Sequence, residues 1–165
     1  MPDFFSRPIV CNTGPLIALS RASLGGLLVA VFPRVVTTTK VVAELTAKDS
    51  LDLGEIQLTL KGLEILEASR PDPLLLTELD SGEASVIQAA RDLGFQNVLI
   101  DERRARRIAT KVYHLDVRGT CGLLVEAKRR ALLASVGMAL RLIIQGGYFI
   151  GPDLLAECLK RAGED

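Results

Sequence analysis

Short runs of aliphatic residues alternate along the chain with segments in which apolar residues recur every three or four positions. The aliphatic runs have the length of strands and lack polar alternation, which is typical of a parallel sheet covered by helices on both faces. They predict five strands, at Ile9–Asn12, Val35–Thr37, Leu63–Leu66, Val98–Asp101 and Leu115–Val117. Strands that alternate with helices favour an α/β fold with right-handed crossovers.

The segments with helical periodicity fill most of the gaps between these runs. The first predicted helix begins at Pro15, a residue that suits a first helical turn. Three more helices are predicted at Thr39–Ala47, Gly82–Leu93 and Arg103–Val112. Three further helices follow Gly119, at Thr120–Arg130, Ser135–Gln145 and Pro152–Arg161. The segment Ser69–Pro73 predicts a stiff loop and not a linker. We therefore expect one domain over residues 1–165, with 119–165 as its helical C-terminal part.

Polar residues follow two of the predicted strands. Asp101 ends the strand Val98–Asp101, and Asn12 ends the strand that begins at Ile9. Ligands in open α/β sheets bind outside the carboxyl ends of the strands, so these two side chains mark a candidate site. An aspartate between a strand and a helix is also a common helix N-cap, and this interpretation of Asp101 stays open.

Two glutamates border apolar helix faces. Glu83 lies in a first helical turn three residues after Asp80, which is the pattern of a capping box. It also shares a face with Ile87 and Ala90, where a carboxylate needs a partner such as a cation, because burying a lone charge is costly. Glu44 lies beside an apolar face in the same way, although a solvated helix glutamate is the commoner case. Hard divalent cations prefer such oxygen ligands.

A cluster of cations follows Asp101 on one predicted helix. It comprises Arg103, Arg104, Arg106, Arg107 and Lys111. These residues are a solvated helix face, with Glu102 and Arg106 as an i, i+4 pair, or a local site for phosphate groups. The formal net charge of the chain is zero, so any nucleic acid must be held by such a local patch. Arg103 and Arg104 are our candidates for contacts with substrate phosphates.

Composition excludes several other classes of protein. The chain has no GxxxxGK[ST] or GxGxxG motif, no nucleophile elbow and no zinc-ligand spacing. Its three cysteines, at 11, 121 and 158, show no CxxC spacing and are expected to be reduced. No leader peptide is evident, and the longest apolar run, Leu24–Phe32, is too short to span a bilayer. We therefore expect a cytoplasmic protein without membrane contact.

Four short motifs follow one another in a set order. They are Asn12-Thr13-Gly14-Pro15-Leu16-Ile17, Val42-Ala43-Glu44-Leu45, Gly82-Glu83-Ala84 and Leu99-Ile100-Asp101-Glu102. With this ordered set the chain resembles PIN-domain proteins, and among them a little-characterised prokaryotic branch related to VapC toxins. The resemblance extends over almost the whole chain, including Arg118-Gly119-Thr120 and the tail from Gly147 to Gly163.

The resemblance implies a three-layer α/β/α fold with a five-stranded parallel sheet, and a ribonuclease site that depends on Mg²⁺ or Mn²⁺. The residues that it places at the metal and in catalysis are Asn12, Glu44, Glu83 and Asp101. It places the hydroxyls of Thr13 and Thr120 near the site as substrate contacts. PIN domains typically have an aspartate where this chain has Asn12, whose amide oxygen is a metal ligand without charge.

Two hypotheses follow from these residues. The first is a metal-dependent endoribonuclease that acts on single-stranded or structured RNA, and that is the toxin of a toxin–antitoxin pair with a small antitoxin protein as its partner. The second is a catalytically degenerate PIN-like module for binding or regulation, which the neutral Asn12 and the zero net charge favour. The aliphatic helices also leave room for a homodimer interface.

Overall fold

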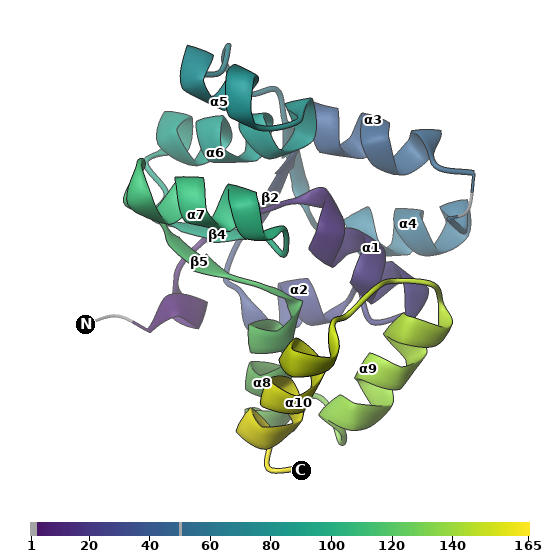
Figure 1. Cartoon of the computed structure of the whole chain (residues 1–165). Coiled ribbons are helices and arrows are strands. Elements are labelled where there is room, and N and C mark those ends of the chain that lie inside the picture. The colour runs from purple at the N-terminus through teal and green to yellow at the C-terminus, as the bar shows by residue number, and fades with distance from the viewer. Residues whose placement is uncertain (1–2, 50) are drawn as a thin grey trace.

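A parallel sheet of five strands forms the centre of the computed structural model, which describes residues 3–49 and 51–165 (Figure 1). The strands lie in the order β3-β2-β1-β4-β5. Their bounds are β1 (Ile9–Cys11), β2 (Val35–Thr38), β3 (Glu64–Leu66), β4 (Asn97–Leu99) and β5 (Asp116–Arg118). All neighbouring pairs are parallel, with Val10 of β1 opposite Val36 of β2 and Val98 of β4.

Helices connect these strands and continue after the sheet is complete. In the first half of the chain they are the 3-10 helix η1 (Phe4–Ser6), α1 (Thr13–Arg21), α2 (Leu27–Val31), α3 (Thr39–Ala47), α4 (Leu53–Leu60) and α5 (Pro73–Glu78). In the second half they are α6 (Ser81–Leu93), α7 (Arg103–Lys111), α8 (Thr120–Arg129), α9 (Val136–Gln145) and α10 (Pro152–Arg161).

The helices cover both faces of the sheet and give the fold three layers. Helix α6 packs against β1, β2 and β4 and also contacts α3 and α5. On the other side α1 contacts α4 and α8, and α8 contacts α2 (Figure 1). The C-terminal helices α8, α9 and α10 pack against one another, and α9 reaches α1. The end of the chain is thereby folded back against the first helix after β1.

The two central strands are completely buried. Ile9, Val10 and Cys11 of β1, and Val98 and Leu99 of β4, have no exposed surface. This explains why these strands appear in the sequence as unbroken aliphatic runs without polar alternation. The buried polar residue of these strands, Asn97 at the start of β4, donates to the carbonyl of Phe4 at 2.8 Å, and further polar residues follow where the strands end.

The predicted fold class, a three-layer α/β/α fold with five parallel strands, is confirmed. The ends of the elements differ by one or two residues from the prediction: β4 ends at Leu99 and not at Asp101, and β5 begins at Asp116. The predicted end of α6 at Leu93 is correct, since Gly94 follows this helix in the left-handed conformation that glycine favours.

Four of the described helices were not predicted from the sequence. They are the 3-10 helix η1 and the helices α2, α4 and α5, of which α2 and α5 are only five and six residues long. An apolar periodicity cannot be recognised over so few positions, and their stability comes from packing. The predicted loop Ser69–Pro73 is correct up to Pro73, which begins α5 after its N-cap Asp72. Within the described residues, no helix combines the length and the apolar character needed to cross a membrane.

Candidate active site

Asn12 and Asp101 lie side by side at the carboxyl edge of the sheet. Cys11 pairs with Leu99 in the β1–β4 register, and the backbone N–H of Asn12 continues the ladder by donating to the carbonyl of Leu99 at 3.0 Å. The residues that follow the two strands are therefore neighbours although 89 positions separate them in the sequence. Beyond this edge lies a pocket of about 690 Å³.

The pocket collects seven of the eight site residues predicted from the sequence. Its lining includes Asn12, Thr13, Glu44, Glu83, Asp101, Arg103 and Thr120. These side chains come from the end of β1, from α1, α3, α6 and α8, and from the β4–α7 connection, so that four crossovers open onto one cavity. The eighth predicted residue, Arg104, lies outside it.

The carboxylate of Asp101 is held by three donors. It accepts hydrogen bonds from the backbone N–H of Thr120 at 2.7 Å, from the Thr120 hydroxyl at 2.7 Å and from the Tyr148 hydroxyl at 2.6 Å. The residue before Thr120 is glycine because a Cβ at Gly119 would lie 2.6 Å from Asp101 Oδ1. Burial and the neighbouring charge of Asp101 raise the pKa of Tyr148 well above its ordinary value, so this hydroxyl remains a donor.

Asp101 is not the N-cap of α7, contrary to one of the two interpretations of the sequence. The cap is Glu102, whose carboxylate accepts from the backbone N–H groups of Arg104 at 3.0 Å and Ala105 at 2.8 Å. Because Glu102 accepts from the backbone N–H groups at the start of α7, the carboxylate of Asp101 is not used as a cap and lines the pocket.

Glu44 connects three helices at the pocket wall. Its carboxylate accepts from the Thr13 hydroxyl of α1 at 2.7 Å and from the backbone N–H of Gly82 in α6 at 3.0 Å. A Cβ at position 82 would overlap this carboxylate, so only glycine permits the approach. The hydroxyls of Thr13 and Thr120 thus donate hydrogen bonds to the carboxylates of Glu44 and Asp101. In this structure they position these acids and are not available to contact a substrate.

Glu83 is both a capping residue and a buried acid. The capping box is present, with the backbone N–H of Glu83 donating to Asp80 Oδ1 at 2.8 Å and that of Asp80 donating to Glu83 Oε1 at 3.4 Å. The side chain is also buried, with 9% of its surface exposed. Burial, together with the hydrogen bond and charge of Asp80, raises the pKa of Glu83 to about 8. Glu83 is therefore mostly protonated at neutral pH.

Two buried oxygens in this pocket have no hydrogen-bond partner among the described residues. They are Oδ1 of Asn12, which is 4% exposed, and Oε2 of Glu83. Asn12 precedes α1 at the N-cap position, yet its side chain does not cap the helix. A buried acceptor without a donor is rare in folded proteins and calls for a bound water or cation. Both residues line the cavity that Glu44 and Asp101 also line.

The donor chemistry of the pocket fits a hard divalent cation, because Asn12, Glu44, Glu83 and Asp101 supply only oxygen ligands. Their spacing is wider than a closed metal site: over residues 3–49 and 51–165, no three His, Cys, Asp or Glu side chains come close enough to share an ion. Each carboxylate is held instead by donors of its own. Drawing them together requires side chains to rotate away from these donors.

The arginines of α7 separate into different roles. Arg103 lines the pocket, whereas Arg104 forms an ion pair with Glu78 of α5. Successive residues point about 100° apart around a helix, so the two side chains leave α7 in different directions. The role of Arg104 as a phosphate contact stays a prediction. The predicted pair of Glu102 and Arg106 is replaced, since Arg106 donates to the carbonyl of Ile100 at 2.9 Å.

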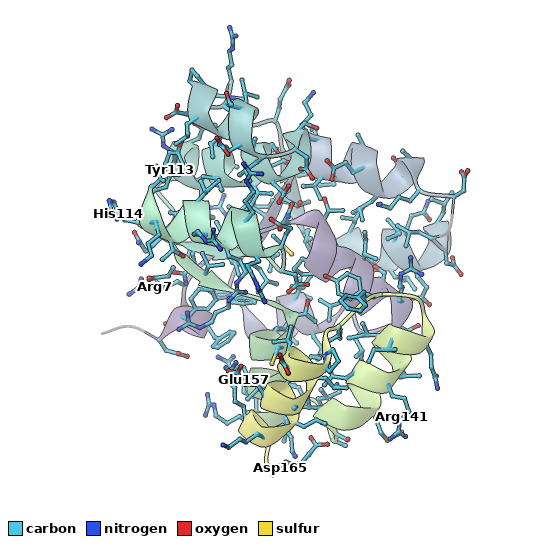
Figure 2. The ribbon with its side chains drawn as sticks, in the orientation of Figure 1. Arg7, Tyr113, His114, Arg141, Glu157 and Asp165 are labelled. Carbon is cyan, nitrogen blue, oxygen red and sulfur yellow. The ribbon has the colours of Figure 1, made fainter. Side chains whose placement is uncertain are left out.

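Most of the other residues that line the pocket were not predicted as site residues, and three of them add to its chemistry. Lys48, directly after α3, adds a second cation, and the loop between α9 and α10 adds Tyr148 and Phe149. No local pattern marks them, because they reach the pocket only through tertiary packing. The single histidine, His114, is exposed beyond the C-terminal end of α7 and lies apart from the pocket, so it is no base at this site (Figure 2).

Comparison with known proteins agrees with this architecture. A family model described as a PIN domain matches residues 8–164, which include every residue of the pocket. No curated protein and no solved structure matches the chain. PIN domains are generally metal-dependent nucleases. The match covers nearly the whole length, and the chain therefore belongs to the PIN-domain family.

Proposed function

We propose that this chain is an endoribonuclease that requires Mg²⁺ or Mn²⁺ and cleaves single-stranded or structured RNA. One observation carries the proposal: two buried oxygens without a hydrogen-bond partner, on Asn12 and Glu83, belong to residues that line the same cavity as Glu44 and Asp101. In a purely structural polar cluster, buried acceptors of this kind would be expected to have donors.

Asn12, Glu44, Glu83 and Asp101 would hold the cation. When bound, the ion supplies activation of water and neutralisation of charge at the phosphorus. Thr120 keeps the Asp101 carboxylate directed into the pocket through two hydrogen bonds. Glu83 must lose its proton before its carboxylate holds a cation, since its pKa is about 8. Metal binding at neutral pH is therefore expected to release a proton.

Two cations at the pocket are suited to the phosphate backbone. Arg103 and Lys48 both line it, and neither forms an ion pair with a carboxylate of the described residues. Guanidinium and ammonium groups beside a phosphodiester fix its position and reduce its charge without reading sequence. We assign them to the phosphates that flank the scissile bond.

We further propose the biological setting that the sequence suggests. An RNA-cleaving protein of the VapC kind would be the toxin of a toxin–antitoxin pair in the cytoplasm, where the three free cysteines stay reduced. Its partners would be RNA, a small antitoxin protein and a second copy of the chain. Exposed apolar side chains on α9, such as Met138 and Leu142, offer a surface for a protein partner.

A second candidate function is a PIN-like module that binds without cleaving. Asn12 in place of a charged ligand favours it, as does the spacing of the carboxylates within the described residues. A crystal soaked in Mn²⁺ separates the two. Anomalous density among Glu44, Glu83 and Asp101 supports the enzyme, and an empty pocket supports the binding module.

The test of the enzyme is cleavage of a labelled RNA with Mg²⁺, with Mn²⁺ and with EDTA. Asp101→Asn should abolish cleavage, because it removes the charge of a direct metal ligand at constant size. Asp116→Asn is the matched control, since Asp116 begins β5 and pairs with Arg7, outside the pocket lining. Cleavage that survives both EDTA and Asp101→Asn would refute the proposal.

A further inference from the structure

Phe149 has the most exposed large apolar side chain of the described residues, at 85%. The other four phenylalanines are buried or half-buried, and three of them (Phe4, Phe5 and Phe32) form an aromatic cluster. Leu58, at 63%, lies on α4 away from the pocket, whereas Leu154 of α10, at 49%, also lines it. Phe149 is distinct because it brings a highly exposed aromatic ring to the cavity that holds the acids.

The loop that carries Phe149 is anchored on both sides. Before it, the Tyr148 hydroxyl donates to Asp101 at 2.6 Å, and the Tyr148 backbone N–H donates to Ile143 at 3.2 Å. After it, Ile150 packs against the core. Arg21 of α1 donates to the carbonyl of Gly146, so the loop follows α1 (Figure 1). Phe149 is therefore presented to solvent by a held backbone.

The hydrogen bond of Tyr148 keeps the neighbouring Phe149 close to the acids of the pocket. Tyr148 binds the same Asp101 carboxylate that we assign to the metal, and Phe149 is the next residue along the chain. Arg103 and Lys48 line the same pocket and offer positive charge for phosphates. Cations for the backbone beside an aromatic surface for a base are the two elements with which proteins bind single-stranded nucleic acid.

We propose that Phe149 stacks on an unpaired nucleobase next to the scissile phosphate. This rests on the proposed function and assigns to that site a residue that contacts an RNA base. Inside an A-form duplex both faces of a base are covered by neighbouring bases, so only a single strand, a loop or a bulge offers a free face to the ring. Every base has such a face, so stacking by itself selects for unpaired RNA and not for sequence.

The proposal is tested by binding and not by cleavage. The affinity of the full chain for a short fluorescent single-stranded RNA is measured in EDTA, so that no hydrolysis takes place. Phe149→Ala should weaken binding about 5- to 150-fold, the loss expected for one stacked base. Phe149→Leu should lose nearly as much, whereas Phe149→Trp should retain binding. Leu58→Ala, a control at an exposed apolar residue outside the pocket lining, should bind like the wild type.

A series of RNAs with one abasic nucleotide locates the stacked base. At that position the abasic RNA should bind wild-type protein as weakly as intact RNA binds Phe149→Ala, and combining both changes should cost no more than either. Equal affinity of Phe149→Ala and wild type for intact RNA would overturn the inference and leave the ring for a protein partner. Normal stacking without any metal-dependent cleavage would refute only the proposed enzyme, since binding is measured without hydrolysis.

Discussion

Glu83 and Glu164 are two glutamates whose pKa values are shifted in opposite directions. The carboxylate of Glu164, after α10, accepts from the Ser135 hydroxyl at 2.8 Å, from Lys128 Nζ at 3.0 Å and from two backbone N–H groups at the start of α9. These donors lower the pKa of Glu164 to about 2. Glu83 has one capping contact and one oxygen without a partner, and its pKa is about 8.

The difference shows that burial without donors raises the pKa of one glutamate, whereas a full set of donors lowers the pKa of the other. Glu164 ties the end of the chain to α8 and α9 and has all its oxygens engaged. Glu83 lies at the mouth of β1 and β4, where the nearest acids, Asp80 and Glu102, disfavour its charge. Only a cation or a proton stabilises such a carboxyl group, which supports its assignment as a metal ligand.

The pH dependence of stability is the strongest test of this comparison. The pKa of Glu83 is raised from 4.5 to about 8. Its contribution to the stability of the fold is therefore complete below pH 4.5 and is lost as the pH rises to about 8. The free energy of unfolding should fall there by at most about 1.4 kcal/mol per pH unit. The pKa of Glu164 is lowered, so its contribution is present above pH 4.5 and is lost as the pH falls towards 2.

Urea unfolding from pH 3 to pH 9 measures both effects. Glu83→Gln should remove the decline in the free energy of unfolding above pH 4.5 and leave its decline at lower pH unchanged. Glu164→Gln should remove the decline at low pH and leave that above pH 4.5 unchanged. If Glu83→Gln retains the alkaline decline, another group causes it, and the contrast between the two glutamates is wrong.

The rate of RNA cleavage should also differ widely between variants of the two glutamates. Changes to groups that only support metal ligands commonly reduce affinity or activity about 10- to 100-fold, so Glu83→Gln should reduce RNA cleavage at least 100-fold. Glu164→Gln should stay within about twofold of wild type at 25 °C, because Glu164 lies outside the pocket lining. Initial rates at saturating Mg²⁺ give the comparison, and equal rates of the two variants would contradict it.

Asn12→Asp would sharpen the contrast by adding a charge where Oδ1 has no donor. Mg²⁺ affinity should rise about tenfold or more, since a ligand gains a charge at nearly constant shape. The metal-free protein should lose stability, because one more carboxylate joins Glu83 and Asp101. Thermal melts with and without Mg²⁺ measure both effects. Unchanged melts in both conditions would show that residue 12 does not face the acids.

The smallest effect is expected for the arginines of α7. Arg103→Ala should weaken RNA binding a few-fold and reduce its slope against log salt by about 0.7, the value for one phosphate contact on a single strand. Arg104→Ala is the control, because this residue pairs with Glu78 and points away from the pocket. Binding titrations from 50 to about 300 mM salt measure the slopes. A slope that changes only in Arg104→Ala would reverse the two assignments.

The chain by itself determined the fold class and most of the pocket. The aliphatic runs that became β1 and β4 are buried on both faces, so a polar residue directly after them must lie at the carboxyl edge. Asn12 and Asp101 were found for this reason. Glu44 and Glu83 were found because their helices bring an acid to an otherwise apolar face, a periodicity that is local and therefore visible in sequence.

Tertiary structure alone decided which groups these acids meet. Tyr148 reaches Asp101 across 47 positions, because α9 and α10 fold back along α1. Glu102 and not Asp101 caps α7, and Arg104 turns to Glu78; each choice depends on geometry that residue types do not encode. Whether a buried oxygen finds a donor is set by all the elements around it, so the partnerless atoms of Asn12 and Glu83 become apparent only once the chain has packed.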